Sequence, residues 1–194
     1  QGGDAIYEDV NHDGQINALD VVYLGNCLPK LSGGFNISFD YGRWNLKARF
    51  MYRYGNKVIN QARMTLESMS TAYNQASSVN WRWRKDGDET LMPRAIYVYN
   101  DNSAYNYQGS SRYVEDGSFL RFQNLQVGYN FDPKELKKYG LNRLQLYVTA
   151  NNLFCWTRYS GVDPEISIGG WGQAIDKSQT PRAKSFTANI NIGF

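Results

Sequence analysis

The chain has 194 residues and a formal net charge of +3, from 21 Lys and Arg against 18 Asp and Glu. Its basic residues are scattered and form no tract that would grip phosphate, so a nucleic-acid partner is not expected. No run of about 18 apolar residues exists, which excludes a transmembrane helix, whereas the strands of a membrane barrel need only about 9 to 11 alternating residues. The 15 Tyr, 9 Phe and 18 Gly favour strands and turns over helices.

Residues 1–33 are predicted to form an extracellular loop with a calcium-loop-like motif. Oxygen donors stand at the ligand positions of a twelve-residue calcium loop: Asp9, Asn11, Asp13, the carbonyl of Gln15, and Asp20. Gly14 stands where such loops turn sharply, so the spacing predicts bound Ca²⁺, with a metal-free turn rich in Asp and Asn as the alternative. His12 is the single histidine of the chain, which argues against a histidine-based catalytic or metal centre.

Five segments alternate between apolar and polar residues, the pattern of strands with one apolar and one hydrated face. Gly42-Arg43 is predicted to be the short turn of a hairpin, and a phase slip near Gln123-Asn124 predicts a β-bulge. On the second segment, Lys47, Arg49 and Arg53 fall on the polar side. The five segments are residues 35–41, 44–54, 118–131, 143–152 and 186–194.

The connections between these segments alternate between short and long. Residues 132–142 form a short one with a single helical turn, whereas 55–117 and 154–183 are predicted as long extracellular loops. Short periplasmic turns and long outer loops are typical of outer-membrane barrels. Five strands cannot close such a barrel, for which about eight is the usual minimum, so the other strands are expected to lie outside this chain. The predicted fold class is all-β: an antiparallel transmembrane β-barrel, of which 34–194 supplies the C-terminal strands.

One helix is expected within residues 55–73. Its apolar side chains recur at helical spacing and would share one stripe: Val58, Ala62, Leu66, Met69 and Tyr73.

Several strings resemble the C-terminal region of SusC/RagA-type TonB-dependent outer-membrane transporters, in the order in which that family has them. Residues 71–107 match no string of the family, as expected for a variable outer loop. The similar strings are GDAIYEDVNHDG at 3–14, YGNK at 54–57, SRYVEDGSFLR at 111–121, NNLF at 151–154, YSGVDPE at 159–165 and the terminal aromatic Phe194.

The resemblance implies a plugged barrel of the roughly 22-stranded type in the outer membrane of a Gram-negative bacterium. It implies active import of oligosaccharides or oligopeptides, driven through TonB, with a SusD/RagB-type surface lipoprotein as partner. The plug and the segment that contacts TonB would lie upstream of Gln1. The resemblance implies a transporter and not an enzyme.

Tryptophans in the predicted outer loops are the candidate substrate contacts, because indole faces stack on sugar rings and peptide side chains. The candidates are Trp81, Trp83 and Trp171. For Trp156, close to a strand end, an aromatic girdle at the membrane interface is the favoured interpretation.

Two carboxylate pairs, Glu115-Asp116 and Asp163-Pro164-Glu165, would suit the acid and base of a glycosidase. Both stand beside strand boundaries, where capping of the turn is the favoured role. Cys27 and Cys155 fit no metal or redox spacing, and whether they pair is left open.

The main alternative is a secreted, calcium-containing β-sandwich that binds glycans. A sandwich would bury the apolar faces of its strands in a dry core, whereas a barrel exposes them to lipid. The exposure of Leu46, Leu146 and Ile190 therefore discriminates between the two folds.

Overall fold

The computed structural model describes residues 2–70, 72, 74–96, 104–168 and 174–194. The chain divides into two units, each built from three segments. Unit 1 comprises Gln1–Cys27, Lys57–Glu115 and Ile166–Gln179, and unit 2 comprises Leu28–Asn56, Asp116–Glu165 and Thr180–Phe194. Within the described ranges, no helix is long and apolar enough to cross a membrane.

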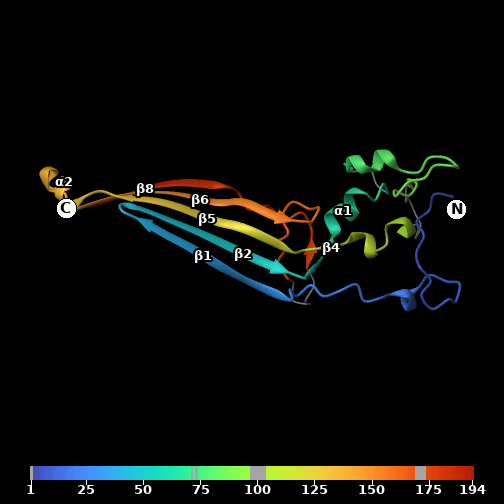
Figure 1. The fold of residues 1–194 in the computed structure, drawn as a ribbon. Helices are drawn as coiled ribbons and strands as arrows, with labels where there is room; N and C mark the ends of the chain where they lie inside the picture. The colour runs from blue at the N-terminus through green and yellow to red at the C-terminus, as the bar shows by residue number, and fades with distance from the viewer. Residues whose placement is uncertain (1, 71, 73, 97–103, 169–173) are drawn as a thin grey trace. The chain divides into compact units, whose positions relative to one another are not determined.

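Unit 2 is built around an antiparallel sheet of five strands in the order β1-β2-β5-β6-β8 (Figure 1). Each strand pairs with the next strand of this sheet along the chain, as in a meander. The five predicted strands and their antiparallel arrangement are confirmed. Their bounds are β1 Leu31–Tyr41, β2 Trp44–Tyr54, β5 Phe119–Asn130, β6 Arg143–Thr157 and β8 Ser185–Gly193.

The two predicted short turns are present. Tyr41 pairs with Trp44 across the first turn, where Gly42 has a φ of 57°, a conformation that favours glycine. In the second turn Asp132 caps the short helix α2 (Pro133–Leu136), accepting a hydrogen bond from the Lys134 N–H at 2.8 Å. A 3₁₀ turn, η5 (Lys137–Tyr139), follows.

Strand β6 continues to Thr157, beyond the end that alternation predicts at Asn152. The register of β5 and β6 shifts between Phe122 and Asn124, which confirms the predicted bulge. Opposite this bulge, Asn152 has a φ of 52° and places a polar residue at a position where alternation expects an apolar one, and the apolar positions continue beyond it at Phe154 and Trp156. A single polar residue at an apolar position therefore made the predicted strand end too early.

Unit 1 contains a small sheet in the order β4-β3-β7, in which β3 and β7 are parallel. Its strands are β3 Lys57–Asn60, β4 Val114–Asp116, whose last residue falls in unit 2, and β7 Ile175–Asp176. Short helices complete the described part of the unit: α1 Gln61–Leu66, η1 Ala18–Asp20, η2 Ser77–Trp81, η3 Ala104–Tyr107 and η4 Ser111–Tyr113.

The predicted helix is present but shorter than its apolar stripe. Asn60 caps α1 by accepting from the Arg63 N–H at 2.9 Å, so Val58 belongs to β3 instead. Tyr73 lies outside the described residues. The stripe residue Met69 lies beyond the helix and packs with Val79, Met92 and Tyr107 in a buried cluster. Apolar spacing alone thus overestimates this helix, because the tertiary core uses the same residues.

Candidate functional site

Strand register in unit 2 joins the alternating apolar residues into continuous rows. One row is Phe39, Leu46, Val127, Val148 and Ala188, and the next is Tyr41, Trp44, Tyr129, Leu146 and Ile190. The three side chains that discriminate between a barrel and a sandwich are exposed to solvent on this face, by 37% at Leu46, 37% at Leu146 and 62% at Ile190. The dry core that a β-sandwich requires is therefore not formed by these residues, and that alternative is not supported.

Aromatic side chains border the apolar face at both ends of the strands. Near the hairpin turn, Trp44 packs on Tyr129 with 4.8 Å between ring centroids. At the other end Phe35 and Phe122 stack on Phe50, with centroid distances of 4.8 and 4.7 Å. The six steps from Trp44 to Phe50 correspond to about 20 Å of strand. Two aromatic bands at this separation match the girdles of an outer-membrane barrel, whose apolar band is about 25 Å tall.

Trp156 lies on this same apolar face, beside Phe154 at 6.0 Å between ring centroids. It is 52% exposed. This position agrees with the predicted girdle role and not with a loop that meets substrate.

The opposite face of the sheet is hydrophilic. Cross-strand hydrogen bonds join Asn124 Nδ2 to Asn151 Oδ1 at 2.7 Å, and Asn151 Nδ2 to Ser185 Oγ at 3.0 Å. A hollow of about 520 Å³ lies over this face, lined by Asp40, Asn45, Lys47, Gln126, Tyr147, Asn189 and Asn191. The register also puts Lys47, Arg49 and Arg53 on this face, as the alternation predicts.

A buried ion cluster holds the loop after β6 to the sheet. Arg121, 4% exposed, donates to Asp163 Oδ1 at 2.5 Å, and its Nε lies 3.4 Å from Glu165 Oε2. Glu165 also pairs with Arg182 at 2.7 Å. The Asp163 and Glu165 carboxylates are thus engaged by arginines, which supports a structural role rather than glycosidase chemistry.

The calcium-loop-like motif folds as a tight turn held by its own carboxylates. Asp9 Oδ2 accepts from the Gly14 N–H at 2.8 Å, and Asp20 accepts from the N–H groups of Val10 and Asn17 at 2.9 and 2.7 Å. Hydrogen bonds from the Asn11 amide and from the Gln15 N–H lower the pKa of Asp13. The donors are hard oxygens of the kind calcium prefers. Among the described residues, however, no three His, Cys, Asp or Glu side chains gather closely enough to hold a metal ion.

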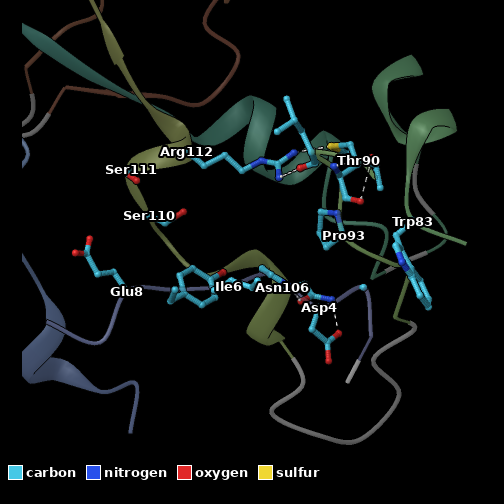
Figure 2. A pocket seen from close by; sticks show the side chains of 15 residues that line it. Asp4, Ile6, Glu8, Trp83, Thr90, Pro93, Asn106, Ser110, Ser111 and Arg112 are labelled. Atoms are coloured by element: carbon cyan, nitrogen blue, oxygen red, sulfur yellow. Dashed lines mark hydrogen bonds between the residues drawn. The ribbon is translucent and has the colours of Figure 1, made fainter. Parts of the chain in front are cut away.

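Of the three candidate tryptophans, Trp83 lines a cavity of about 520 Å³ in unit 1 (Figure 2). The cavity lies between the extended segment around Ile6, the Thr90–Pro93 stretch and Arg112. One face of the Trp83 ring is covered by Gly3, where an added Cβ would come within 2.4 Å of the indole. Trp81 is 79% exposed and does not line this cavity. Trp171 lies outside the described residues.

The N-terminal segment at this cavity is fixed by an ion pair that sequence reasoning missed. Arg94 donates to both carboxylate oxygens of Asp4, at 2.7 and 3.3 Å, and the Asn106 amide donates to Asp4 at 3.1 Å. The pairing with Arg94 holds the pKa of Asp4 well below its usual range. The partners are 90 residues apart, and no local pattern signals them.

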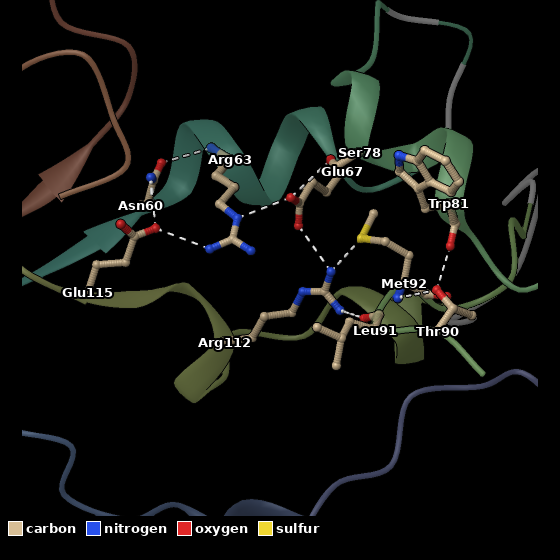
Figure 3. A network of polar contacts seen from close by, with 10 residues as sticks. All are labelled: Asn60, Arg63, Glu67, Ser78, Trp81, Thr90, Leu91, Met92, Arg112 and Glu115. Atoms are coloured by element: carbon tan, nitrogen blue, oxygen red, sulfur yellow. Dashed lines mark hydrogen bonds and ion pairs between the residues drawn. The ribbon is translucent and has the colours of Figure 1, made fainter. Parts of the chain in front are cut away.

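A second polar network centres on Glu67, which is 5% exposed (Figure 3). Its carboxylate accepts from Arg63 at 3.0 Å, from Ser78 at 3.2 Å and from Arg112 at 3.2 Å. Arg63 also reaches Glu115 at 3.2 Å. Burial alone would lower the pKa of Arg63, but the bonds to these two carboxylates raise it. The spacing of Arg63 and Glu67 on a helix was the one signal in the sequence that pointed to this network.

The other predicted carboxylate pair is divided between two structural tasks. Glu115 accepts from Asn60 at 3.1 Å as well as from Arg63. Asp116 caps the turn before β5, accepting from the Ser118 N–H at 3.0 Å and from its hydroxyl at 2.6 Å. This is the favoured capping role.

The chain resembles curated TonB-dependent receptors over its whole length, although no family model matches it. It is 33% identical over 202 residues to TonB-dependent receptor P39 of Formosa agariphila, and the alignment covers all of this chain and 19% of that protein. Receptor P3 of the same organism is 29% identical, over 99% of this chain and 19% of its own length. SusC of Bacteroides thetaiotaomicron is 31% identical over 86 residues, 44% of this chain and 8% of that protein. The chain thus spans about a fifth of the length of the full-length matches among these curated relatives.

The chain also resembles solved structures of a transporter of this kind. The RagAB peptide importer in its open-open state superposes with a TM-score of 0.77 and 26% identity, covering 97% of this chain and 20% of the importer chain. Its closed-closed state gives a TM-score of 0.75 and 25% identity, over 94% of this chain and 20% of that one.

Proposed function

We propose, given that this chain belongs to the SusC/RagA family of TonB-dependent transporters and forms part of its β-barrel, that the full-length protein imports oligopeptides or oligosaccharides across the outer membrane. In this proposal transport is driven through TonB. The chain has no catalytic role in this proposal. In support, its relatives are named as receptors and an importer, and its paired carboxylates are occupied by structural contacts.

One observation carries the proposal: a sheet whose rows are apolar on one face and hydrogen-bonded and polar on the other. In a membrane barrel the apolar face contacts lipid, and the polar face lines a hydrated interior. The connections follow the same logic. Short turns join β1 to β2 and β5 to β6, whereas the segments of unit 1 precede β1 and connect β2 to β5 and β6 to β8.

A SusD/RagB-type surface lipoprotein is the proposed partner, because the RagAB importer is the solved structure that this chain resembles. The long segments of unit 1 would then face outward, toward the lipoprotein and the incoming cargo. Within them, Trp83 is the proposed substrate contact, supported by its position on the wall of a cavity.

We also propose that the loop from Asp9 to Asp20 binds calcium outside the cell. The tight turn at Gly14 and the hard oxygen donors support this assignment. The carboxylates would have to exchange some of their bonds to backbone N–H groups for bonds to the ion.

The test is made in the native host with the full-length gene. Deleting the gene is expected to abolish uptake of the peptide or oligosaccharide that it serves, and disabling TonB should have the same effect. Complementation with the intact gene is expected to restore uptake, and a SusD/RagB-type surface lipoprotein is expected to co-purify in detergent. Normal uptake of every peptide and oligosaccharide supplied, in both the deletion strain and the TonB-deficient strain, would overturn the proposal.

A further inference from the structure

The charged residues of the five-stranded sheet are strongly biased in sign. The strands contain five cations and one anion, and the alternation puts all of them on the polar face. The anion is Asp40, and the cations are Lys47, Arg49, Arg53, Arg121 and Arg143. This bias is larger than the +3 net charge of the whole chain, so it belongs to this face and not to the composition.

Arg121 shows what a structural cation looks like in this unit. It is 4% exposed and is neutralised by two carboxylates of its own chain, Asp163 and Glu165. Its positive charge is therefore already neutralised and does not serve to bind a ligand.

Lys47 and Arg49 have the opposite surroundings. Both are exposed, and their direct cross-strand neighbours are neutral: Ser38 and Gln126 beside Lys47, Asn36 and Asn124 beside Arg49. Asp40 pairs with Asn45, one diagonal step from Lys47 and two from Arg49. Within the described residues, no ion pair joins either cation to a carboxylate.

The two side chains form a basic strip. They stand two residues apart on one strand, about 7 Å. An arginine fork binds a carboxylate with two parallel hydrogen bonds, and a lysine acts as a point charge beside it. The flanking amides and hydroxyls can bind further oxygens without competing for the positive charge. A surplus of one sign beside a low-dielectric wall also raises the local concentration of the opposite ion.

We propose that the basic strip Lys47–Arg49 selects carboxylate-bearing cargo: acidic oligopeptides or uronic-acid oligosaccharides. This inference rests on the proposed import function and narrows its substrate class. The strip is exposed and Lys47 borders a hollow of about 520 Å³, so it can release as well as bind its ligand, as passage requires. The alternative occupant, an acidic segment of the full-length protein packed permanently on the strip, is an outcome of the test.

The experiment uses the full-length transporter in its host, with the native lipoprotein. The variant is Lys47→Gln with Arg49→Gln, and the charge-preserving control is Lys47→Arg with Arg49→Lys. Uptake is measured with radiolabelled peptides of equal length that carry glutamate in one set and glutamine in the other. Oligogalacturonate and a neutral maltooligosaccharide form the second pair of probes. Barrel assembly is checked by heat-modifiable migration on gels.

We expect the glutamine variant to lose about tenfold or more of its uptake of the acidic member of the transported pair, with uptake of the neutral member unchanged. The control should keep both activities, and added salt should weaken acidic uptake in the wild type and in the control but not in the glutamine variant. The pair that responds identifies the source of the carboxylate. An equal loss for acidic and neutral cargo, or defective assembly, would mean that the strip packs on another part of the protein. If the wild type imports neutral cargo but not acidic cargo, only this inference fails. If it imports neither, this inference fails, and the proposed function fails with it only when the deletion strain also takes up every peptide and oligosaccharide supplied as the wild type does.

Discussion

Unit 2 and unit 1 are stabilised in different ways, although both come from the same 194 residues. In unit 2 a repeating backbone ladder joins the strands of the sheet, and, apart from the buried Arg121 that binds Asp163 and Glu165, the strand side chains need only the right polarity on each face. In unit 1 the described structure depends on individual contacts, such as the carboxylate of Glu67 and the ion pair of Asp4 with Arg94. A two-residue period is enough to encode the first, whereas the second requires particular residues at distant positions.

The sharpest way to break this comparison is a charge on the apolar face. Val148 is 55% exposed and stands in the middle of its row, between Val127 and Ala188. Val148→Arg in the full-length protein is expected to lower the free energy of unfolding of the barrel by about 2–4 kcal/mol, because the cation would face hydrocarbon. Assembly measured by heat-modifiable migration should fall steeply.

The matched control is Thr149→Arg, one residue along the same strand and on the opposite face. Since that face is polar, assembly should stay at the wild-type level. Equal damage from both variants would mean that the two faces do not differ in environment, and the membrane assignment would be lost.

A smaller effect is expected from the network in unit 1. Glu67→Gln removes the negative charge that Arg63 and Arg112 share. Both arginines are about one-third exposed, so water offsets part of the loss, and a destabilisation of about 2 kcal/mol is expected. Hydrogen exchange on the full-length protein should then speed up in α1 and η4 and remain unchanged in β5 and β6.

Glu89→Gln is the control, because Glu89 is an exposed glutamate of the same unit. It should leave the exchange of α1 unaltered. Faster exchange throughout the sheet in Glu67→Gln would show that the two units do not stabilise themselves independently.

The strands were predictable because alternation is a local signal. The prediction of strand ends failed where that signal is interrupted: at Gly33-Gly34, where β1 has no side chains to alternate, and at Asn152, where a polar residue occupies an apolar position of β6. The short turns were also predictable, because glycine at position 42 readily adopts the positive φ of the turn and proline at position 133 favours the first position of a helix. The resemblance to SusC/RagA transporters is confirmed, and it rested on strings spread along nearly the whole chain.

Unit 1 was much less predictable, because its contacts join residues that are far apart in sequence. Asp4 and Arg94 are separated by 90 residues, and Glu67 and Arg112 by 45. No period links such positions, so their roles emerge only in three dimensions. Trp83 was predicted from its residue type, and the cavity beside it was not.

The smallest expected effect concerns the loop from Asp9 to Asp20, a part of unit 1 that also depends on individual carboxylates. At calcium concentrations of about 2 mM, a site of the affinity typical for extracellular modules contributes about 1 kcal/mol to local stability. Limited proteolysis of the full-length protein should therefore cut this loop several-fold more slowly with calcium than with a chelator. Asp9→Asn should abolish the difference, because it removes the carboxylate at the first ligand position, while its amide oxygen can still accept from the Gly14 N–H. If the wild-type loop is cut at one rate in calcium and in chelator, the hydrogen bonds among Asp9, Asp13 and Asp20 are sufficient by themselves, and the motif is a metal-free turn.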